Sequence, residues 1–229
     1  TKLFILNSPS NPTGASYTRA ELAALGKVLE QHPSIVTVSD DIYEHIHWGG
    51  EPFSSFATTC ARLRDRIVTT NGVSKAYAMT GWRIGYAAGP QWLIEAMKTV
   101  QSQSTSNACS ISQAASEAAL DGDHTVVANM TAAYKARHDF LVEALNEIEG
   151  FECRPGEGTF YAFPRVTGAL ERLRLATDVE LAERLLDKSD LATVPGSAFG
   201  APGYLRLSFA CSMESLEEAV NRIKRGLAA

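Results

Sequence analysis

The sequence predicts an α/β fold in which most of a mainly parallel sheet is followed by a smaller α+β domain. Short apolar runs alternate with helical patterns in the first part of the chain, and this alternation is typical of parallel sheets. Beyond about residue 150 the helices are mixed with short strand-like segments instead. The 229 residues are enough for one or two domains with substantial cores.

Four short apolar runs are predicted to be strands of the first sheet. They cover residues 2–6, 35–39, 66–70 and 84–88. A helix separates the first two, and this strand–helix–strand order predicts a right-handed parallel unit. The first run ends in a turn-rich loop, where Asn11-Pro12 is a candidate cis peptide because X-Pro bonds are the usual place for one.

Helical patterns connect and follow these runs. Thr18 and Glu21 have the spacing of a capping box, and apolar residues at helical intervals come after them. Further helices are expected over residues 91–103, 111–120 and 124–148. The last of these is long enough to leave one domain and enter the next. We therefore expect the boundary near residue 135, with domains at 1–135 and 136–229.

The second domain is expected to combine short strands with helices. The strands are predicted at residues 151–153, 159–163, 192–194 and 205–209, and the helices at 179–186 and 215–227. Ser215 and Glu218 have capping-box spacing, which predicts that the final helix opens there.

Composition excludes several classes of partner. With 45% hydrophobic residues, 21% charged residues and a net charge of −5, the chain has no basic footprint for nucleic acid. No apolar run approaches a membrane span. The four cysteines are scattered without a Cys-x-x-Cys pair, which predicts reduced, mostly buried thiols in a cytoplasmic protein. His45 and His47 alternate as a metal pair would, but no third ligand is evident, so no metal is expected.

Lys75 and Arg83 are the first candidates for chemistry. Lys75 follows the end of a predicted strand, where open α/β sheets place their reactive groups, and Arg83 is expected at the head of the next strand. A lysine amine attacks a carbonyl when its site is partly desolvated, and an arginine holds a phosphate through paired N–H donors. The pair suggests a nucleophile beside an anion clamp.

Four separated motifs carry the most specific signal in the chain. The longest is Ser74-Lys-Ala-Tyr-Ala-Met-Thr-Gly-Trp-Arg-Ile-Gly-Tyr86. The others are Asn11-Pro-Thr-Gly14, Asp40-Asp-Ile-Tyr43 and the segment around Arg206. In sequence and in order, across essentially the whole chain, they resemble the motifs of the class I aminotransferases, the fold type I pyridoxal-phosphate enzymes. They are most similar to those of bacterial aspartate and prephenate aminotransferases.

The resemblance implies a role for each matched residue. Lys75 would form an aldimine with pyridoxal 5′-phosphate and later move the substrate's α-proton. Asp40 would face the pyridine nitrogen and favour its protonated form, because an opposite charge stabilises a charged group. Tyr43 and Asn11 would contact the phenolic oxygen. Asp41 is the competing candidate for the role of Asp40, but strand alternation points it the other way.

The resemblance also assigns the anion-binding groups. Arg83 would hold the phosphate. Arg206, with Asn11, would hold the substrate's α-carboxylate, since a strand arginine among apolar neighbours needs an anion. One departure from the wider family is Gly72, where many members carry a hydroxyl residue as a phosphate ligand. Ser74 is a weaker candidate for that contact. Phe160, in a segment that borders the substrate in the family, is equally well explained as a buried aromatic residue.

The implied function is ping-pong transamination between an amino acid, aspartate or glutamate, and a 2-oxo acid. Alternatives are an aromatic, prephenate or alanine-type aminotransferase, another fold type I enzyme, or a non-catalytic module that binds the cofactor. The family's Gly-rich phosphate turn and the aromatic residue stacked on the cofactor are not found. We therefore expect the chain to be the carboxyl-terminal part of a homodimeric enzyme and to be inactive alone.

Overall fold

The computed structural model describes residues 1–228 and divides into two compact units. The first unit contains Thr1–Pro9 and Ser16–Thr131, and the second contains Ser10–Ala15 and the chain from Ala132 onward. The loop that carries Asn11 therefore belongs to the second unit although it lies near the start of the sequence. The predicted domain boundary near residue 135 stays a prediction.

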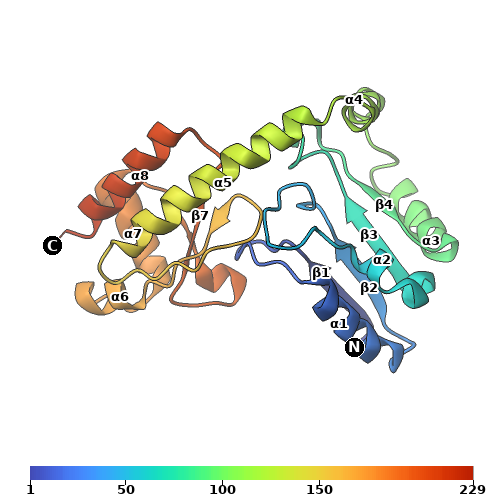
Figure 1. Ribbon diagram of the computed structural model, residues 1–229, viewed down its shortest axis with the longest axis horizontal. Coiled ribbons are helices and arrows are strands. Elements are labelled where there is room, and N and C mark those ends of the chain that lie inside the picture. Colours follow the sequence, from blue (N-terminus) through green and yellow to red (C-terminus); the bar gives the residue numbers. More distant parts are fainter. Residues whose placement is uncertain (229) are drawn as a thin grey trace. The chain divides into compact units, whose positions relative to one another are not determined.

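The first unit is built on a four-stranded sheet in the order β1-β2-β3-β4 (Figure 1). Its strands are β1 (Leu3–Asn7), β2 (Val36–Asp40), β3 (Ile67–Asn71) and β4 (Tyr86–Ala88). The first three strands are parallel, as predicted, whereas β4 runs antiparallel to β3. In the register, Asn7 lies opposite Asp40, and Asp40 lies opposite Thr70. The carboxyl ends of the three parallel strands consequently meet at one edge.

The core of the first unit lies between the sheet and the helices that follow β1 and β2. These are α1 (Arg19–Glu30), α2 (Phe56–Thr59) and the 3-10 helix η1 (Ala61–Arg66). The buried core cluster joins the three to the sheet: Leu6, Leu22, Leu29, Phe56, Cys60, Leu63 and Ile67. The capping box at Thr18 and Glu21 is present, which confirms that prediction. The sequence did not predict α2, because four residues give too little periodicity.

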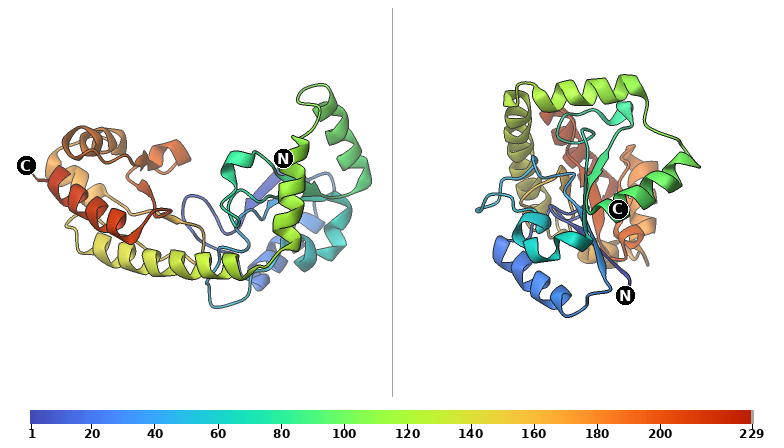
Figure 2. Two further views of the ribbon diagram at one scale, coloured as in Figure 1. Left: turned by 90° about the horizontal axis from the view of Figure 1, so that it is seen from above. Right: turned by 90° about the vertical axis from the view of Figure 1, so that its right-hand side faces the viewer.

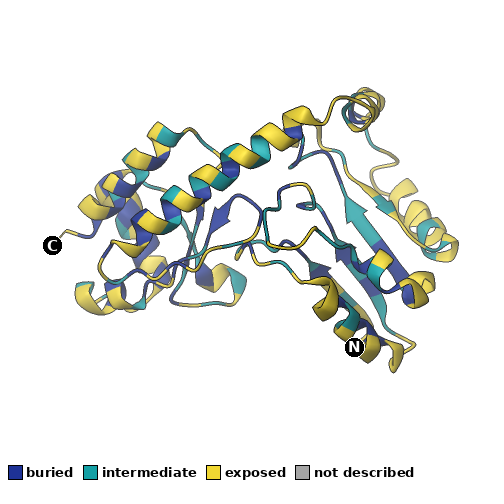
Figure 3. Cartoon of the chain, viewed as in Figure 1, coloured by how far each residue is buried: buried dark blue, intermediate teal, exposed yellow. Residues whose placement is uncertain are grey.

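Two further helices complete the first unit, and they are poorly covered. They are α3 (Gln91–Ser102), which follows the sheet, and α4 (Ser110–Asp121). No residue of α3 is buried, and its apolar side chains include Trp92 at 56% exposure and Val100 at 70% (Figure 3). An amphipathic helix normally buries its apolar face, so this face lacks a covering element among the described residues.

The second unit combines a three-stranded antiparallel sheet with helices. The sheet has the order β5-β7-β6, with β5 (Tyr161–Ala162), β6 (Val194–Pro195) and β7 (Leu205–Ser208). The helices are α5 (Thr125–Asn146), α6 (Thr167–Leu173), α7 (Asp178–Ser189), the 3-10 helix η3 (Gly196–Phe199) and α8 (Met213–Gly226). The division between the two units falls within α5. Figure 2 shows α7 beside α8. Leu181, Leu185 and Ile223 are almost fully buried there.

Three local predictions were wrong. Ser215 does not open the last helix: α8 begins at Met213, and the hydroxyl of Ser212 accepts a hydrogen bond from the Ser215 backbone N–H. The strand predicted at residues 151–153 is a single bridge between Glu152 and Arg165. Arg83 is not at the head of a strand, because β4 begins only at Tyr86. By contrast, the Asn11–Pro12 peptide bond is cis, as predicted.

All four cysteines are free thiols, of which Cys60 and Cys153 are buried and Cys109 is exposed. Burial raises the pKa of the Cys153 thiol to about 11, which keeps it protonated. Within residues 1–228, no helix is both long and apolar enough to cross a membrane. The same residues contain no group of three or more His, Cys, Asp and Glu side chains that could hold a metal ion.

Candidate active-site residues

Asp40 ends β2 at the edge where the parallel strands finish. Its carboxylate accepts a hydrogen bond from the Ile42 backbone N–H at 3.3 Å. Burial raises the pKa of this carboxyl, while the Ile42 N–H, the Thr70 hydroxyl and the positive charge of Lys75 act in the opposite direction. The net shift is upward, so the charged form of Asp40 is under-compensated in the protein alone. A cationic ligand group beside it would correct this imbalance.

Asp41, the rival candidate, is 4% exposed and already engaged. The Ser39 hydroxyl donates to its carboxylate at 2.6 Å, and its backbone N–H donates to the Thr70 carbonyl at 2.9 Å. These contacts tie β2 to β3 and give Asp41 a structural role. They favour Asp40 as the residue available to a ligand.

Tyr43 and Lys75 come together in the first unit. Tyr43 is 3% exposed, and the Lys75 ammonium lies 6.0 Å from the centre of its ring. Lys75 is half-buried in the turn that follows β3. Asn71, the last residue of β3, shapes the start of this turn: it donates to Glu44 at 2.5 Å and accepts from the Gly72 N–H at 2.7 Å. Asn71 and Glu44 were not singled out from the sequence, since nothing in their spacing marks them.

Arg83 occupies an unusual place in the same segment. It follows the 3-10 helix η2 (Thr80–Trp82) with a left-handed backbone, φ 51°, and is exposed. Its guanidinium donates to the Thr80 carbonyl at 2.9 Å within its own turn. A non-glycine residue in this conformation is uncommon and marks a constrained turn. Arg83 is therefore held close to the backbone of the Lys75 segment.

In the second unit, the side chains of Asn11 and Arg206 form a hydrogen bond. The Arg206 guanidinium on β7 donates to the Asn11 side-chain oxygen at 2.9 Å. The Asn11 loop is fixed by Gly14, whose carbonyl accepts hydrogen bonds from the N–H groups of Glu157 and Gly158. Gly14 has φ +69°, and a Cβ there would lie 2.8 Å from the Gly158 carbonyl oxygen. The loop can approach this closely only because position 14 is glycine.

Two aromatic rings lie near the Arg206 guanidinium, and the sequence did not predict these contacts. The guanidinium carbon is 4.5 Å from the centre of the Tyr161 ring and 4.9 Å from that of Phe199. Tyr161 comes from β5 and Phe199 from η3. Among the described residues Arg206 forms no ion pair with a carboxylate, and a guanidinium carries five N–H donors that an anion can accept from.

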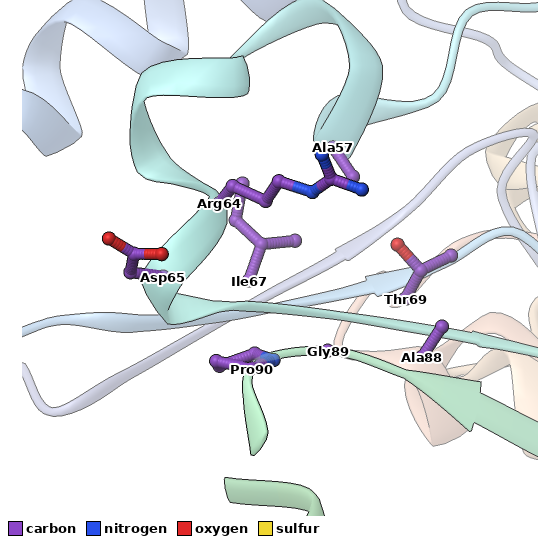
Figure 4. A pocket seen from close by; sticks show the side chains of 8 residues that line it. All are labelled: Ala57, Arg64, Asp65, Ile67, Thr69, Ala88, Gly89 and Pro90. Carbon is purple, nitrogen blue, oxygen red and sulfur yellow. The ribbon is translucent and has the colours of Figure 1, made fainter. Parts of the chain in front are cut away.

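Two cavities, one in each unit, are lined by residues other than Asp40, Lys75 and Arg206. In the first unit, a cavity of about 350 Å³ is bordered by Ile67 and Thr69 of β3 and by Gly89. Figure 4 shows Arg64 extended across it, with the Asp65 carboxylate on the other side. Since Ile67 begins β3, this cavity borders the strand from its amino end and does not include Asp40 or Lys75.

The larger hollow, about 720 Å³, lies within the second unit beside the Asn11 loop. Phe163 and Tyr204 line it and stack with their ring centres 5.0 Å apart. Phe163 also meets Phe199 edge-on at 6.1 Å. Phe163, which lines this hollow, thus contacts Phe199, one of the two rings near Arg206.

The first unit of this α/β protein thus has an amine, a carboxylate and a phenol at one edge of its sheet, and the second unit has an arginine held by an amide and near two rings. Residues 1–223 match the family described as aminotransferase class I and II, and the chain belongs to this family. It is 51% identical to the aspartate/prephenate aminotransferase of Nitrosomonas europaea, covering 97% of this chain and 58% of that protein. It is 47% identical to the aspartate aminotransferase of Rhizobium meliloti, covering 97% and 56%.

Solved structures agree with the fold. The crystal structure of the aspartate aminotransferase from Rhizobium meliloti superposes with a TM-score of 0.94 at 46% identity, covering 99% of this chain and 58% of that one. An aromatic aminotransferase from Pyrococcus horikoshii gives 0.91 at 35% identity, covering 99% and 60%. The predicted fold class, the fold type I architecture, is confirmed. The chain spans somewhat more than half the length of these relatives.

The residues of the first unit fit pyridoxal phosphate, the cofactor implied by this family. The Asp40 carboxylate can pair with a protonated pyridine nitrogen, the Lys75 amine can bind an aldehyde, and the Tyr43 hydroxyl can donate to a phenolate oxygen.

Proposed function

We propose that this chain carries the cofactor lysine and the carboxylate-binding arginine of a pyridoxal-phosphate-dependent aminotransferase. The single observation that supports it best is the grouping of Asp40, Tyr43 and Lys75 at the carboxyl ends of parallel strands, in a member of the aminotransferase class I and II family. The reaction would exchange an amino group between an amino acid and a 2-oxo acid.

Five residues would hold the cofactor: Asn11, Asp40, Tyr43, Lys75 and Arg83. When bound, pyridoxal phosphate supplies an electron sink for the carbanion formed at the substrate's α-carbon. Asp40 would stabilise a positive charge on a ring nitrogen, because an opposite charge favours the ionised form of its half-buried carboxylate. The Tyr43 hydroxyl and the Asn11 side-chain amide would each offer a hydrogen-bond donor to a phenolate oxygen. Arg83 offers its fork of N–H groups to a phosphate.

Lys75 has two tasks. Its Nζ would be the amine that holds the cofactor through its aldehyde, and as a neutral amine the same Nζ would carry the substrate's α-proton. Both tasks require the amine to be held in one direction. The Asn71–Glu44 hydrogen bond supports this, because it fixes the turn from which Lys75 projects.

Arg206 would fix the orientation of the substrate. A guanidinium pairs with a carboxylate through two parallel N–H···O bonds, which set direction as well as affinity. The Asn11 oxygen already occupies one donor of Arg206, so the fork is turned in a defined direction before a substrate binds. A substrate held in this way reaches the reacting geometry with less loss of freedom.

The proposed substrates are aspartate or glutamate with a 2-oxo acid. Relatives named aspartate/prephenate and aspartate aminotransferase support this choice. A structural relative named aromatic aminotransferase keeps aromatic amino acids as the second candidate. A prephenate or alanine-type specificity and a non-catalytic cofactor-binding module are the remaining alternatives, and a substrate panel separates them all.

We further propose that the enzyme works as a homodimer. Several large apolar side chains of the first unit are exposed, notably Ile5 at 64% and Ile111 at 70%, as is α3. Exposed apolar surface of this kind favours association. Sedimentation equilibrium checks this directly: a monomer at micromolar concentration would contradict it.

The test of the proposed function is chemical trapping. The protein is incubated with pyridoxal phosphate, reduced with borohydride and digested, and the modified peptide is identified by mass spectrometry. We expect a pyridoxyl group on Lys75. Modification of another lysine, or none while the cofactor is bound, would refute the assignment.

A further inference from the structure

We propose that Tyr161 and Phe199 are positioning residues that clamp the Arg206 guanidinium between two rings, so that a carboxylate can reach it only in its own plane. The inference rests on the proposed function, because Arg206 is the proposed carboxylate clamp. The observation that carries it is geometric: two ring centres lie 4.5 Å and 4.9 Å from the guanidinium carbon.

The sheet places Tyr161 beside Arg206. Tyr161 on β5 lies directly opposite Ser208 on β7, and Arg206 is two residues from Ser208 on the same face. Diagonal cross-strand neighbours of this kind are within reach of an aromatic side chain. Tyr161 itself is 8% exposed, and its ring packs against Phe160 with centres 4.7 Å apart. The Tyr161 ring is therefore held in place beside Arg206.

A different device places Phe199. The turn η3 follows β6 and folds back over β7, and a Cβ on Gly196 would lie 2.3 Å from the Ala201 carbonyl oxygen. The buried carboxylate of Asp178 accepts the Ser197 N–H at 2.7 Å and anchors the same turn. Phe163 meets Phe199 edge-on and limits its movement. The second ring is thus as firmly held as the first.

The consequence for binding follows from the shape of arginine. Its guanidinium is planar, with all five N–H donors in the plane. In the proposed clamp, one ring covers each face of the guanidinium and leaves its edge as the open approach, and Asn11 occupies part of that edge. The remaining edge presents a fork that fits a carboxylate. The rings also restrict the rotation of a side chain that is otherwise costly to order.

This arrangement predicts an effect common to all amino acid substrates. The α-carboxylate is shared by every amino acid, so loss of a ring should raise KM by the same factor for aspartate, alanine and phenylalanine. A cation–π contact that is partly shielded from water corresponds to a roughly three- to thirtyfold change. The affinity for pyridoxal phosphate should not change, because neither ring is among the residues proposed to hold it.

The experiment compares ring-removing with ring-retaining variants of the holoenzyme. Tyr161→Leu and Phe199→Leu remove the rings, and Tyr161→Phe and Phe199→Tyr retain them. Phe140→Leu, which removes a half-buried ring of α5, is the control. KM and kcat are measured for the three amino acids, and cofactor affinity is measured by absorbance. Rotation of the Arg206 guanidinium is followed by nitrogen-15 NMR of the arginine side chains.

We expect both Leu variants at 161 and 199 to raise KM equally for the three substrates and to speed guanidinium rotation, with the ring-retaining variants and Phe140→Leu close to wild type. Unchanged KM and unchanged rotation would overturn the clamp. A rise in KM for one substrate alone would also overturn it, since the rings would then contact a side chain. If the complete homodimeric enzyme expected from the sequence transaminates nothing, the proposed function fails, and the rotation measurement alone decides the clamp.

Discussion

The two units hold their candidate site residues by different means. In the first unit, Asp40 and Lys75 follow the ends of neighbouring parallel strands, and backbone groups and short polar side chains fix them. In the second unit, Arg206 lies within a strand and is held by side chains: an amide and two rings. The first arrangement suits a reactive group that must move. The second suits a group that must stay in place.

The largest effect is expected in the first unit. Lys75→Ala removes both the nucleophile and the proton carrier, so transamination should fall at least ~10³-fold, within the range of a lost acid–base group. The measurement is the steady-state rate with aspartate and 2-oxoglutarate. Lys27→Ala, an exposed lysine of α1, is the control and should retain the wild-type rate. Activity retained by Lys75→Ala would contradict the assignment.

Asp40→Asn should slow the reaction less, and at a different step. It removes a charge-assisted hydrogen bond, which corresponds to about 1.5–3 kcal/mol. The expected result is slower loss of a deuterium label from the α-carbon with unchanged KM for the amino acid. Asp41→Asn is the matched control, because the Asp41 carboxylate accepts a hydrogen bond from the Ser39 hydroxyl. If Asp41→Asn is the slower variant, the role belongs to Asp41.

A glycine substitution tests how the second unit holds its loop. Gly14→Ala puts a Cβ 2.8 Å from the Gly158 carbonyl oxygen at a residue with φ +69°. Thermal or urea unfolding should show a loss of about 1–3 kcal/mol, and amino acid binding should weaken because Asn11 moves from Arg206. Gly50→Ala is the control, since nothing lies within 4 Å of a Cβ there. Equal stability of the two variants would show that the Gly14 contact is unimportant.

The smallest effect concerns pH and Asp178, which anchors the turn of Phe199. Burial disfavours its charge, but hydrogen bonds from Ser197 and nearby backbone groups outweigh this and hold the pKa of Asp178 below its ordinary value. A carboxyl whose pKa is lower in the folded than in the unfolded chain stabilises the fold when the pH is above the unfolded-state pKa. This stabilisation is lost as the pH falls through the folded-state pKa.

Asp178→Asn should therefore cost about 1 kcal/mol at pH 7, and the difference from wild type should shrink below about pH 4. Urea unfolding at a series of pH values measures this. Asp187→Asn, on the exposed side of α7, is the control and should show no such dependence. A difference between wild type and Asp178→Asn that does not vary with pH would contradict the argument.

Much of the fold followed from sequence because its signals are local. The starts and ends of β1, β2 and β3 lie within one residue of the predicted runs, and the capping box at Thr18 marked α1 correctly. The errors arose where two local signals compete. Ser215 has Glu218 at capping-box spacing and Ser212 does not, yet the fold shows that the hydroxyl of Ser212 caps α8.

The candidate site divides in the same way. Lys75 and Asp40 could be predicted from their motifs and from the strands before them. The clamp around Arg206 could not, because Tyr161, Phe199 and Arg206 come from β5, η3 and β7 and meet only through the sheet. Nothing in the local sequence distinguishes Tyr161 from an ordinary buried aromatic residue.

The central claim is that Asp40, Tyr43 and Lys75 of the first unit serve the cofactor, whereas Arg206 of the second unit serves the amino acid. Arg206→Lys keeps the charge but loses the planar fork, and tests this most directly. KM for aspartate, alanine and phenylalanine and the Kd for pyridoxal phosphate are measured in that one variant. We expect KM to rise by a similar factor, about ten- to a hundredfold, for all three, with the cofactor Kd unchanged. A loss confined to aspartate, or an equal loss of cofactor affinity, would contradict this division.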